Sequence, residues 1–98
     1  MDLSLDSVLV QDKTLPTAEL DGRTVVMSLN AGAYFDFNGV GTEIWRMLAE
    51  PCPVGRILDS LSQNHRVDRE TVAREVTPFL KALLEQQLIR TMPPDGAQ

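Results

Sequence analysis

The dipeptide Asp21-Gly22 governs the local fold of the first half of the chain. It lies between two strand-like runs, residues 17–20 and 23–29. Asp-Gly between such runs is the strongest short signal for a β-hairpin, because Gly accepts the positive φ of a type I′ turn. Residues 30–32, Asn-Ala-Gly, then predict a three-residue loop with Gly in the left-handed conformation, followed by a third strand at 33–37. A three-stranded antiparallel meander is the result.

Alternation along the second and third strands predicts which side chains share a face. The expected inward-facing residues are Val25, Met27 and Leu29 in the second strand and Ala33, Phe35 and Phe37 in the third. Tyr34 and Asp36 are then expected on the opposite face. The apolar face requires a covering layer. Residues 7–10 predict a further short strand, which the polar and Pro-containing run at 13–16 ends.

Helical spacing replaces this alternation after Asn38. Asn38 is the expected N-cap of a helix at about 39–49, in which Trp45 is assigned to the core and which Pro51 prevents from continuing. A second amphipathic helix is predicted at about 54–64. A third is predicted from its N-cap Asp68 to about residue 87. The predicted fold class is therefore α+β, a three-stranded antiparallel sheet followed by three helices.

The apolar arc of the third predicted helix is wide. Placed at about 100° per residue, its apolar side chains span roughly 140°. One border of this arc, with Val72, Phe79 and Leu83, is available to line a groove if the other border packs inward. Periodicity alone leaves both interpretations open, the groove and an arc that is entirely core.

Length and charge limit the classes of function. A chain of 98 residues with 43% hydrophobic content predicts one small folded domain, with residues 1–16 as an N-terminal segment and 91–98 as a flexible tail. The sequence has no apolar run of about 18 residues and begins with an acidic segment, so we expect a cytoplasmic protein that does not enter a membrane. With 14 acidic against 9 basic residues and a net charge of -5, nucleic-acid binding is disfavoured.

The sequence contains no recognisable catalytic or metal-binding constellation. His65 falls in a polar connection, and Cys52, between two prolines, is expected to be an ordinary loop residue without Cys or clustered His partners. The glycines at 39 and 41 open a helix but lack the context of a phosphate-binding loop. We therefore predict a protein that is not an enzyme, with no catalytic residues, no metal and no cofactor.

Several segments, taken together in order and spacing, resemble the PqqD-like family. They cover about residues 17–90 and are Asp21-Gly22, residues 32–38, residues 44–48, residues 76–80 with Leu83, and Leu88-Ile89. Members of this family are recognition elements for precursors of ribosomally synthesised and post-translationally modified peptides (RiPPs). The resemblance implies a winged-helix-like arrangement of the three strands and three helices.

The resemblance also implies a mechanism. In such domains the leader of a precursor peptide adds as an extra strand beside the third strand, in the groove between that strand and the third helix. An edge strand offers unpaired amide and carbonyl groups to such a peptide. Carried over by position, the implied peptide-binding residues are Ala33, Tyr34, Phe35, Asp36, Val72, Glu75, Val76, Phe79 and Leu83.

Family membership leaves the pathway open. The first interpretation is a stand-alone recognition element of lasso-peptide or related RiPP biosynthesis, which works with a companion leader peptidase and cyclase. The alternative is a PqqD-type peptide chaperone for a radical SAM enzyme in pyrroloquinoline quinone synthesis. Two interpretations come from other classes of function. One is a self-associating homodimer formed through the same strand edge, and the other is a winged-helix DNA-binding domain. This chain also departs from the family at Gln87, where Gly is usual before Leu88, and in having Gly39 and Gly41 at the start of the first helix.

Overall fold

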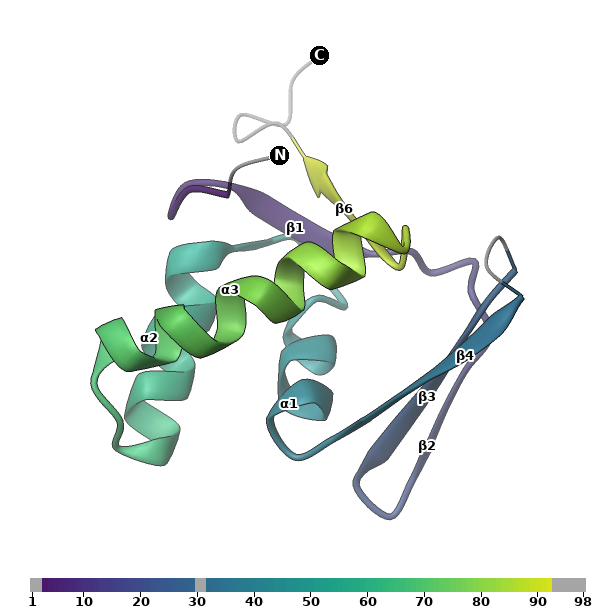
Figure 1. The fold of residues 1–98 in the computed structure, drawn as a ribbon, viewed down its shortest axis with the longest axis horizontal. Coiled ribbons are helices and arrows are strands. Elements are labelled where there is room, and N and C mark those ends of the chain that lie inside the picture. The colour runs from purple at the N-terminus through teal and green to yellow at the C-terminus, as the bar shows by residue number, and fades with distance from the viewer. Residues whose placement is uncertain (1–2, 30–31, 93–98) are drawn as a thin grey trace.

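The structure, a computed structural model that describes residues 3–29 and 32–92, contains two three-stranded antiparallel sheets and three helices (Figure 1). The first sheet has the order β2-β3-β4, with β2 at Thr17–Leu20, β3 at Arg23–Ser28 and β4 at Ala33–Asn38. The second has the order β5-β1-β6, with β5 at Cys52–Pro53, β1 at Val8–Gln11 and β6 at Ile89–Met92. The helices are α1 at Val40–Met47, α2 at Val54–His65 and α3 at Arg69–Glu85. The predicted α+β class is confirmed.

The predicted hairpin is present between β2 and β3. Leu20 pairs with Arg23, and Asp21 (φ 53°) and Gly22 (φ 78°) both have the positive φ of a type I′ turn. In the next connection Gly32 is left-handed (φ 63°) and its N–H donates to the Ser28 carbonyl at 2.9 Å. Residues 30 and 31 of that predicted loop lie outside the described residues.

The prediction of which face of β3 points inward was wrong. The buried residues are Thr24, Val26 and Ser28, whereas Val25 and Met27 are half-buried on the outer face. The register explains this, because Thr24 lies opposite Phe37 and Val26 opposite Phe35, so each shares the face of its cross-strand partner. The inward assignment of the third strand, with Phe37 buried, is confirmed.

A hydrogen-bonded chain makes the burial of Thr24 tolerable. Its hydroxyl donates to Thr42 Oγ1 at 3.1 Å, and the Thr42 hydroxyl donates to the Phe37 carbonyl at 3.1 Å. Buried hydroxyls are costly only when they lack partners. Helix α1 thus supplies the polar group that lets threonine occupy the inner face of β3.

The helix boundaries agree with the prediction, with one exception among the caps. Asp68 caps α3 as expected, since its side chain accepts from the Thr71 backbone N–H. The expected N-cap Asn38 is wrong, because Asn38 is the last residue of β4, paired with Arg23, and Gly39 (φ 53°) makes the turn into α1. Helix α3 continues through Pro78 to Glu85.

Gln87 takes the place of the glycine that is usual in the family before Leu88, and the helix C-cap is kept. Gln87 adopts the left-handed conformation (φ 62°) in which Gly is usual. The Leu88 N–H donates to the Leu83 carbonyl and the Gln87 N–H to the Leu84 carbonyl, both at 3.0 Å. These are the two bonds of a Schellman motif, and they direct the chain into β6.

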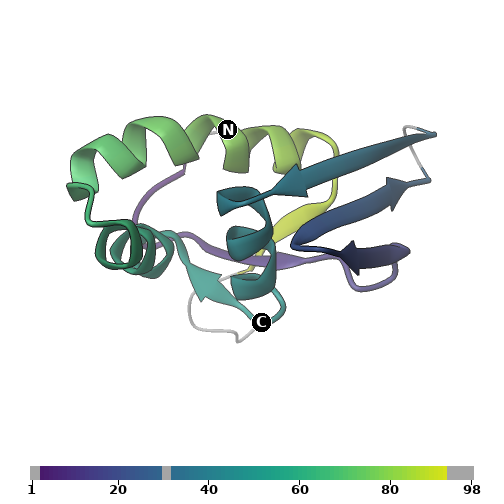
Figure 2. The same ribbon diagram turned by 90° about the horizontal axis from the view of Figure 1, so that it is seen from below.

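Helix α1 lies between the β2-β3-β4 sheet and α2, with α3 crossing the same core (Figures 1 and 2). Trp45, on α1, is 2% exposed, which confirms its assignment to the core. The second sheet closes another side of this core. In it, Leu9 of β1 is fully buried beside Leu80 of α3 and Leu88.

The second sheet also revises two local predictions. A strand forms close to the expected position 7–10, at Val8–Gln11. Cys52 was expected in a loop, but it is a buried residue of β5, because its backbone pairs with Leu9 of β1. Burial raises the pKa of the Cys52 thiol, against a smaller opposing effect of the Arg56 charge. The strand β6 extends to Met92, into the predicted tail, whose residues 93–98 lie outside the described part.

None of the helices described in residues 3–29 and 32–92 has both the length and the apolar character needed to cross a membrane.

Candidate functional site: the groove between β4 and α3

Strand β4 forms an edge of the first sheet. Within the described residues it pairs only with β3, from Arg23↔Asn38 to Ser28↔Ala33. An edge strand leaves alternate backbone N–H and C=O groups without a ladder partner. The expected exposed edge of the third strand is therefore present on this part of the chain.

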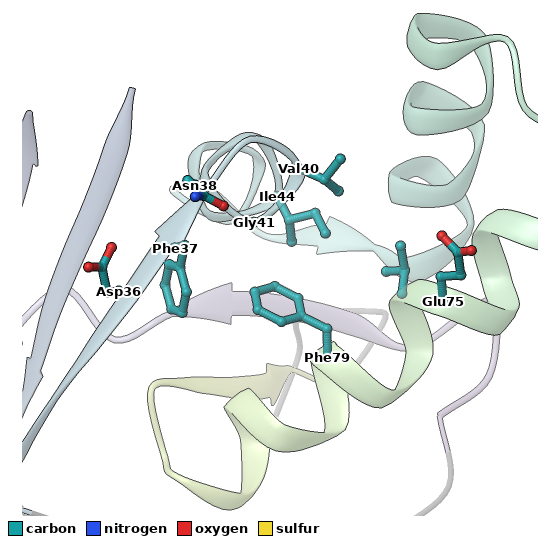
Figure 3. A pocket seen from close by; sticks show the side chains of 9 residues that line it. Asp36, Phe37, Asn38, Val40, Gly41, Ile44, Glu75 and Phe79 are labelled. Carbon is teal, nitrogen blue, oxygen red and sulfur yellow. The ribbon is translucent and has the colours of Figure 1, made fainter. Parts of the chain in front are cut away.

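A cavity of about 360 Å³ lies beside this edge, between β4, α1 and α3 (Figure 3). We call it the first pocket. Its lining comes from three separate elements and is mostly apolar, with two carboxylates and one amide: Asp36, Phe37, Asn38, Val40, Gly41, Ile44, Glu75, Val76 and Phe79. An extended chain added to β4 would have this pocket under one of its two faces.

Two phenylalanine rings shape the first pocket. Phe37 on β4 and Phe79 on α3 project toward one another and meet edge to face, with ring centroids 5.4 Å apart (Figure 3). Phe37 also packs against Trp45, at 5.8 Å, which anchors it to the core. Phe79 remains half-buried, so part of its ring is available to a ligand.

Gly41 allows α1 to approach β4 closely at this point. A Cβ atom added to Gly41 would lie 2.9 Å from the Phe37 Cβ and 3.5 Å from the Phe79 ring. The departure from the family at this position therefore has a steric role in the structure. The absence of a side chain sets how near α1, β4 and α3 come together around the first pocket.

The two acidic residues of the first pocket differ in direction and surroundings: the Asp36 side chain projects from β4 away from Phe37 and the cavity, on the face it shares with Tyr34 (Figure 3). Asp36 on β4 is held by the Arg23 guanidinium, whose Nε donates to Oδ1 at 3.2 Å and whose Nη2 pairs with Oδ2. Glu75 on α3 has no ion-pair or hydrogen-bond partner within the described residues, and it is exposed. The α3 wall therefore carries the negative charge that is available to a ligand.

A second, smaller cavity of about 220 Å³ continues the groove toward the junction of α2 and α3. We call it the second pocket. It shares three residues with the first pocket and adds four more; its lining is Val40, Leu61, His65, Val67, Val72, Glu75 and Val76. The shared wall makes the two pockets neighbours along one groove.

A polar cluster borders the second pocket. Glu43 accepts hydrogen bonds from Asn64 at 2.7 Å and pairs with His65 at 2.8 Å. Burial alone would raise the pKa of Glu43, but these two hydrogen bonds and the His65 charge together lower it below its ordinary value. His65 is thus an exposed residue at the end of α2 that links α2 to α1.

The structure brings together some of the predicted site residues. Asp36, Glu75, Val76 and Phe79 line the first pocket, and Val72 lines the second. The others lie elsewhere. Tyr34 is 67% exposed on the opposite face of β4 and lines a shallow outer cavity with Met27; Leu83 is 3% exposed in the core; Ala33 and Phe35 are half-buried near the start of β4.

Sequence reasoning missed five residues of the first pocket, two at the end of β4 and three on α1. They are Phe37, Asn38, Val40, Gly41 and Ile44. Phe37 was assigned inward but only as core, since alternation does not distinguish a pocket floor from a core position. Val40, an apolar residue in the first turn of the predicted helix, was the available signal on α1.

Comparison with known proteins gives two matches. The family model described as "Coenzyme PQQ synthesis protein D (PqqD)" matches residues 23–89. A solved structure, "TbiB1 in Complex with the TbiA(beta) Leader Peptide", is similar at 32% sequence identity and a TM-score of 0.74. That similarity covers 83% of this chain and 94% of TbiB1. No curated protein gives a significant match.

The family match includes β3, β4 and all three helices, and so both walls of the groove. The structural match to TbiB1 extends over most of both chains at a substantial sequence identity, and it agrees with the family match. On these two findings, the chain belongs to the PqqD family.

Proposed function

We propose that this chain binds the leader region of a ribosomally synthesised precursor peptide by strand addition to β4 and presents it to modifying or processing enzymes. The observation that carries the proposal is the free edge of β4 directly beside an apolar cavity walled by α3. In TbiB1, the similar structure, the bound molecule is a leader peptide. The protein acts as a non-catalytic binding partner in the cytoplasm, with no cofactor.

The edge would supply affinity that depends little on sequence. Strand β4 has six residues, Ala33–Asn38, and an extended peptide of equal length spans about 20 Å. Its main-chain groups would replace water on the free N–H and C=O groups of β4. We assign the pairing edge to Ala33, Tyr34, Phe35 and Asp36.

The groove would supply specificity. Side chains on one face of the added strand enter the first pocket, whose wall includes the contacting rings of Phe37 and Phe79. Side chains on the other face extend the outer surface beside Tyr34. We assign the helix wall to Val72, Glu75, Val76 and Phe79, with Leu83 supporting it from the core.

The enzyme that receives the peptide is a finer proposal. A companion leader peptidase and cyclase of lasso-type biosynthesis is our first choice, and a radical SAM enzyme is the alternative. Both would need the residues beyond the paired segment of the peptide to remain free. Strand addition meets that need, because it holds the peptide along one edge only.

The test is a fluorescence-polarisation titration with labelled synthetic leaders taken from short peptide genes adjacent to the gene for this chain. We expect saturable binding at micromolar concentration or tighter, lost when the leader is scrambled and weakened in Phe79→Ala. Arg56→Glu, on α2 and outside both pockets, is the control and should bind as the wild type does. Equal binding by Phe79→Ala would refute the groove.

Self-association through β4 is the competing use of the same edge. Light scattering over a range of protein concentrations separates the two. A stable dimer that no leader dissociates, together with no leader binding, would replace the proposal with a structural role. A monomer that binds leader would support the proposal.

A further inference from the structure

The second pocket shares Val72, Glu75 and Val76 with the proposed helix wall, but it extends beyond the reach of a peptide paired with β4 alone. It lies past the end of β4, between α1, α2 and α3, so a peptide paired with β4 reaches it only by continuing beyond the sheet. Two of the exposed large apolar residues of the described chain, Val40 (40% exposed) and Val67 (37%), line it. Apolar side chains gathered at the rim of a cavity indicate a site for an apolar ligand group.

The wall formed by Val67 is fixed in place. Val67 follows Arg66, which adopts the left-handed conformation (φ 55°) at the end of α2. The Val67 N–H donates to the Ser62 carbonyl at 3.2 Å, and the Ser62 hydroxyl donates to the Val67 carbonyl at 2.6 Å. A turn residue would ordinarily be polar, yet this tightly hydrogen-bonded turn holds a valine against the cavity.

We propose that the second pocket binds one aliphatic side chain, of leucine, isoleucine or valine, from the same peptide that pairs with β4. This inference rests on the proposed function. The occupant follows from continuity, because Val40, Glu75 and Val76 belong to both pockets and a chain leaving the first passes directly over the second. A volume of about 220 Å³ and a largely apolar lining fit a single aliphatic side chain.

The geometry also predicts where this side chain lies in the peptide. Phe79 of the first pocket and Val72 of the second are two turns apart on α3, which is about 10 Å. An extended peptide advances about 3.3 Å per residue, so the two anchoring side chains are separated by about three or four residues. Pairing antiparallel to β4, as in the rest of this sheet, puts the second anchor on the N-terminal side of the paired segment.

Glu75 limits the residues between the two anchors. It lines both pockets and has no partner within the described residues, so the connecting part of the peptide passes an exposed carboxylate. An acidic residue there would be repelled, and a lysine or arginine would be favoured. The predicted recognition sequence is therefore an aliphatic anchor, a short non-acidic connection and the strand-forming segment.

The experiment needs no knowledge of the natural leader. A displayed library of random 16-residue peptides is selected on the full chain, and the enriched peptides are synthesised, labelled and titrated against the wild type and three variants. Val67→Asp puts a charge into the second pocket, Phe79→Ala opens the first, and Leu20→Asp makes the same chemical change at an exposed apolar residue outside both pockets.

We expect enriched peptides to carry an aliphatic residue three or four positions upstream of their paired segment. Val67→Asp should raise their Kd by about tenfold to a hundredfold, the effect of losing one buried aliphatic side chain. Alanine at the upstream position of the peptide should weaken binding to the wild type by a similar factor and have little further effect on Val67→Asp. Leu20→Asp should bind normally.

The possible failures are distinguishable. If Phe79→Ala weakens binding while Val67→Asp and the upstream alanine do not, the second pocket is not a subsite and the proposed function stands. If no peptide binds the wild type, or Phe79→Ala has no effect, both proposals fail. If thermal unfolding shows that Val67→Asp is not folded, Val67→Thr takes its place, since it keeps the shape and exchanges one methyl for a hydroxyl. The same comparison with the upstream alanine then decides the question.

Discussion

Replacing Gly41 with alanine tests whether close contact between α1 and β4 shapes the groove. The added Cβ would lie 2.9 Å from the Phe37 Cβ, a distance that real Cβ contacts essentially never show. The Phe37 Cβ is attached to the backbone of β4, so a side-chain rotation cannot relieve the overlap. Helix α1 and strand β4 must separate instead.

Two opposing effects determine the size of the change. Gly to Ala in a helix gains at most about 1 kcal/mol of unfolding free energy. Overpacking a close-packed site costs about 1–3 kcal/mol. For Gly41→Ala the steric effect prevails, and we expect a net loss of up to about 2 kcal/mol.

Gly55 is the matched control, since Gly41 and Gly55 are each the second residue of their helix. A Cβ on Gly55 would lie 3.3 Å from the tip of the Arg69 side chain, 3.4 Å from the Leu5 carbonyl and 3.8 Å from the Leu5 Cβ. The arginine tip can move, so Gly55→Ala should keep most of the helix-propensity gain and stabilise the protein by up to about 1 kcal/mol.

Urea unfolding followed by the fluorescence of Trp45, the single tryptophan and a buried one, measures both variants. In thermal unfolding each kcal/mol corresponds to about 4–8 °C for a domain of this size. Gly41→Ala should also weaken leader binding, because the first pocket changes shape, and Gly55→Ala should not. If Gly41→Ala is as stable as Gly55→Ala, the close approach of α1 to β4 is not a constraint and our explanation of the glycine is wrong.

Three further outcomes are expected. Phe79→Ala should lower the unfolding free energy by less than the about 3–5 kcal/mol typical of a buried Phe, because the ring is half-buried, while leader binding falls in the titration described above. Asp36→Lys removes a surface ion pair and should change the unfolding free energy by about 1 kcal/mol or less, yet shift the preference between leaders toward acidic ones; an unchanged preference would remove Asp36 from the site. Hydrogen bonds from nearby threonines lower the pKa of Asp12 and Asp68 below 3.8, so the stabilisation from these carboxylates is complete above about pH 5 and disappears as the pH falls through their folded-state pKa values. The urea midpoint should therefore be lower at pH 3 than at pH 6, and the difference should be smaller in Asp68→Asn. Equal midpoints at the two pH values would contradict this prediction.

Local signals gave correct predictions at the Asp21-Gly22 turn and the Asp68 cap, although the N-cap expected at Asn38 was wrong. The turn at Asp21-Gly22 needs positive φ at two adjacent positions, and the cap at Asp68 needs only a side chain three residues before an N–H. Both are contained in a few consecutive residues. The three helices likewise followed from apolar spacing together with cap and proline signals.

Predictions failed where a distant residue decides the outcome. Thr24 can occupy the inner face of β3 because Thr42 on α1 accepts a hydrogen bond from its hydroxyl. Pairing of β5 and β6 with β1 brings together segments far apart in sequence, which periodicity does not indicate. Tertiary hydrogen bonds and pairing therefore overrode the alternation pattern.

The candidate site was predictable only in part, because some of its residues are positioned by contacts between distant elements. Family resemblance indicated α3, and Glu75, Val76 and Phe79 do line the first pocket. It indicated β4 as a run of consecutive residues, although a strand directs alternate side chains to opposite faces, and so Tyr34 points away from the groove. The α1 wall depends on how closely two elements pack, which no spacing rule supplies.

The pairing of β1 with β6, from Val8↔Met92 to Gln11↔Ile89, has a consequence for how the molecule is made. During translation β1 leaves the ribosome before β5, its first partner, and long before β6, so the hairpins and helices can form before β1 pairs with β6. Closing the long loop between β1 and β6 occurs only after synthesis of β6. Stalled nascent chains that end before Ile89 should remain open to proteolysis around β1, whereas released full-length chains should become protected there.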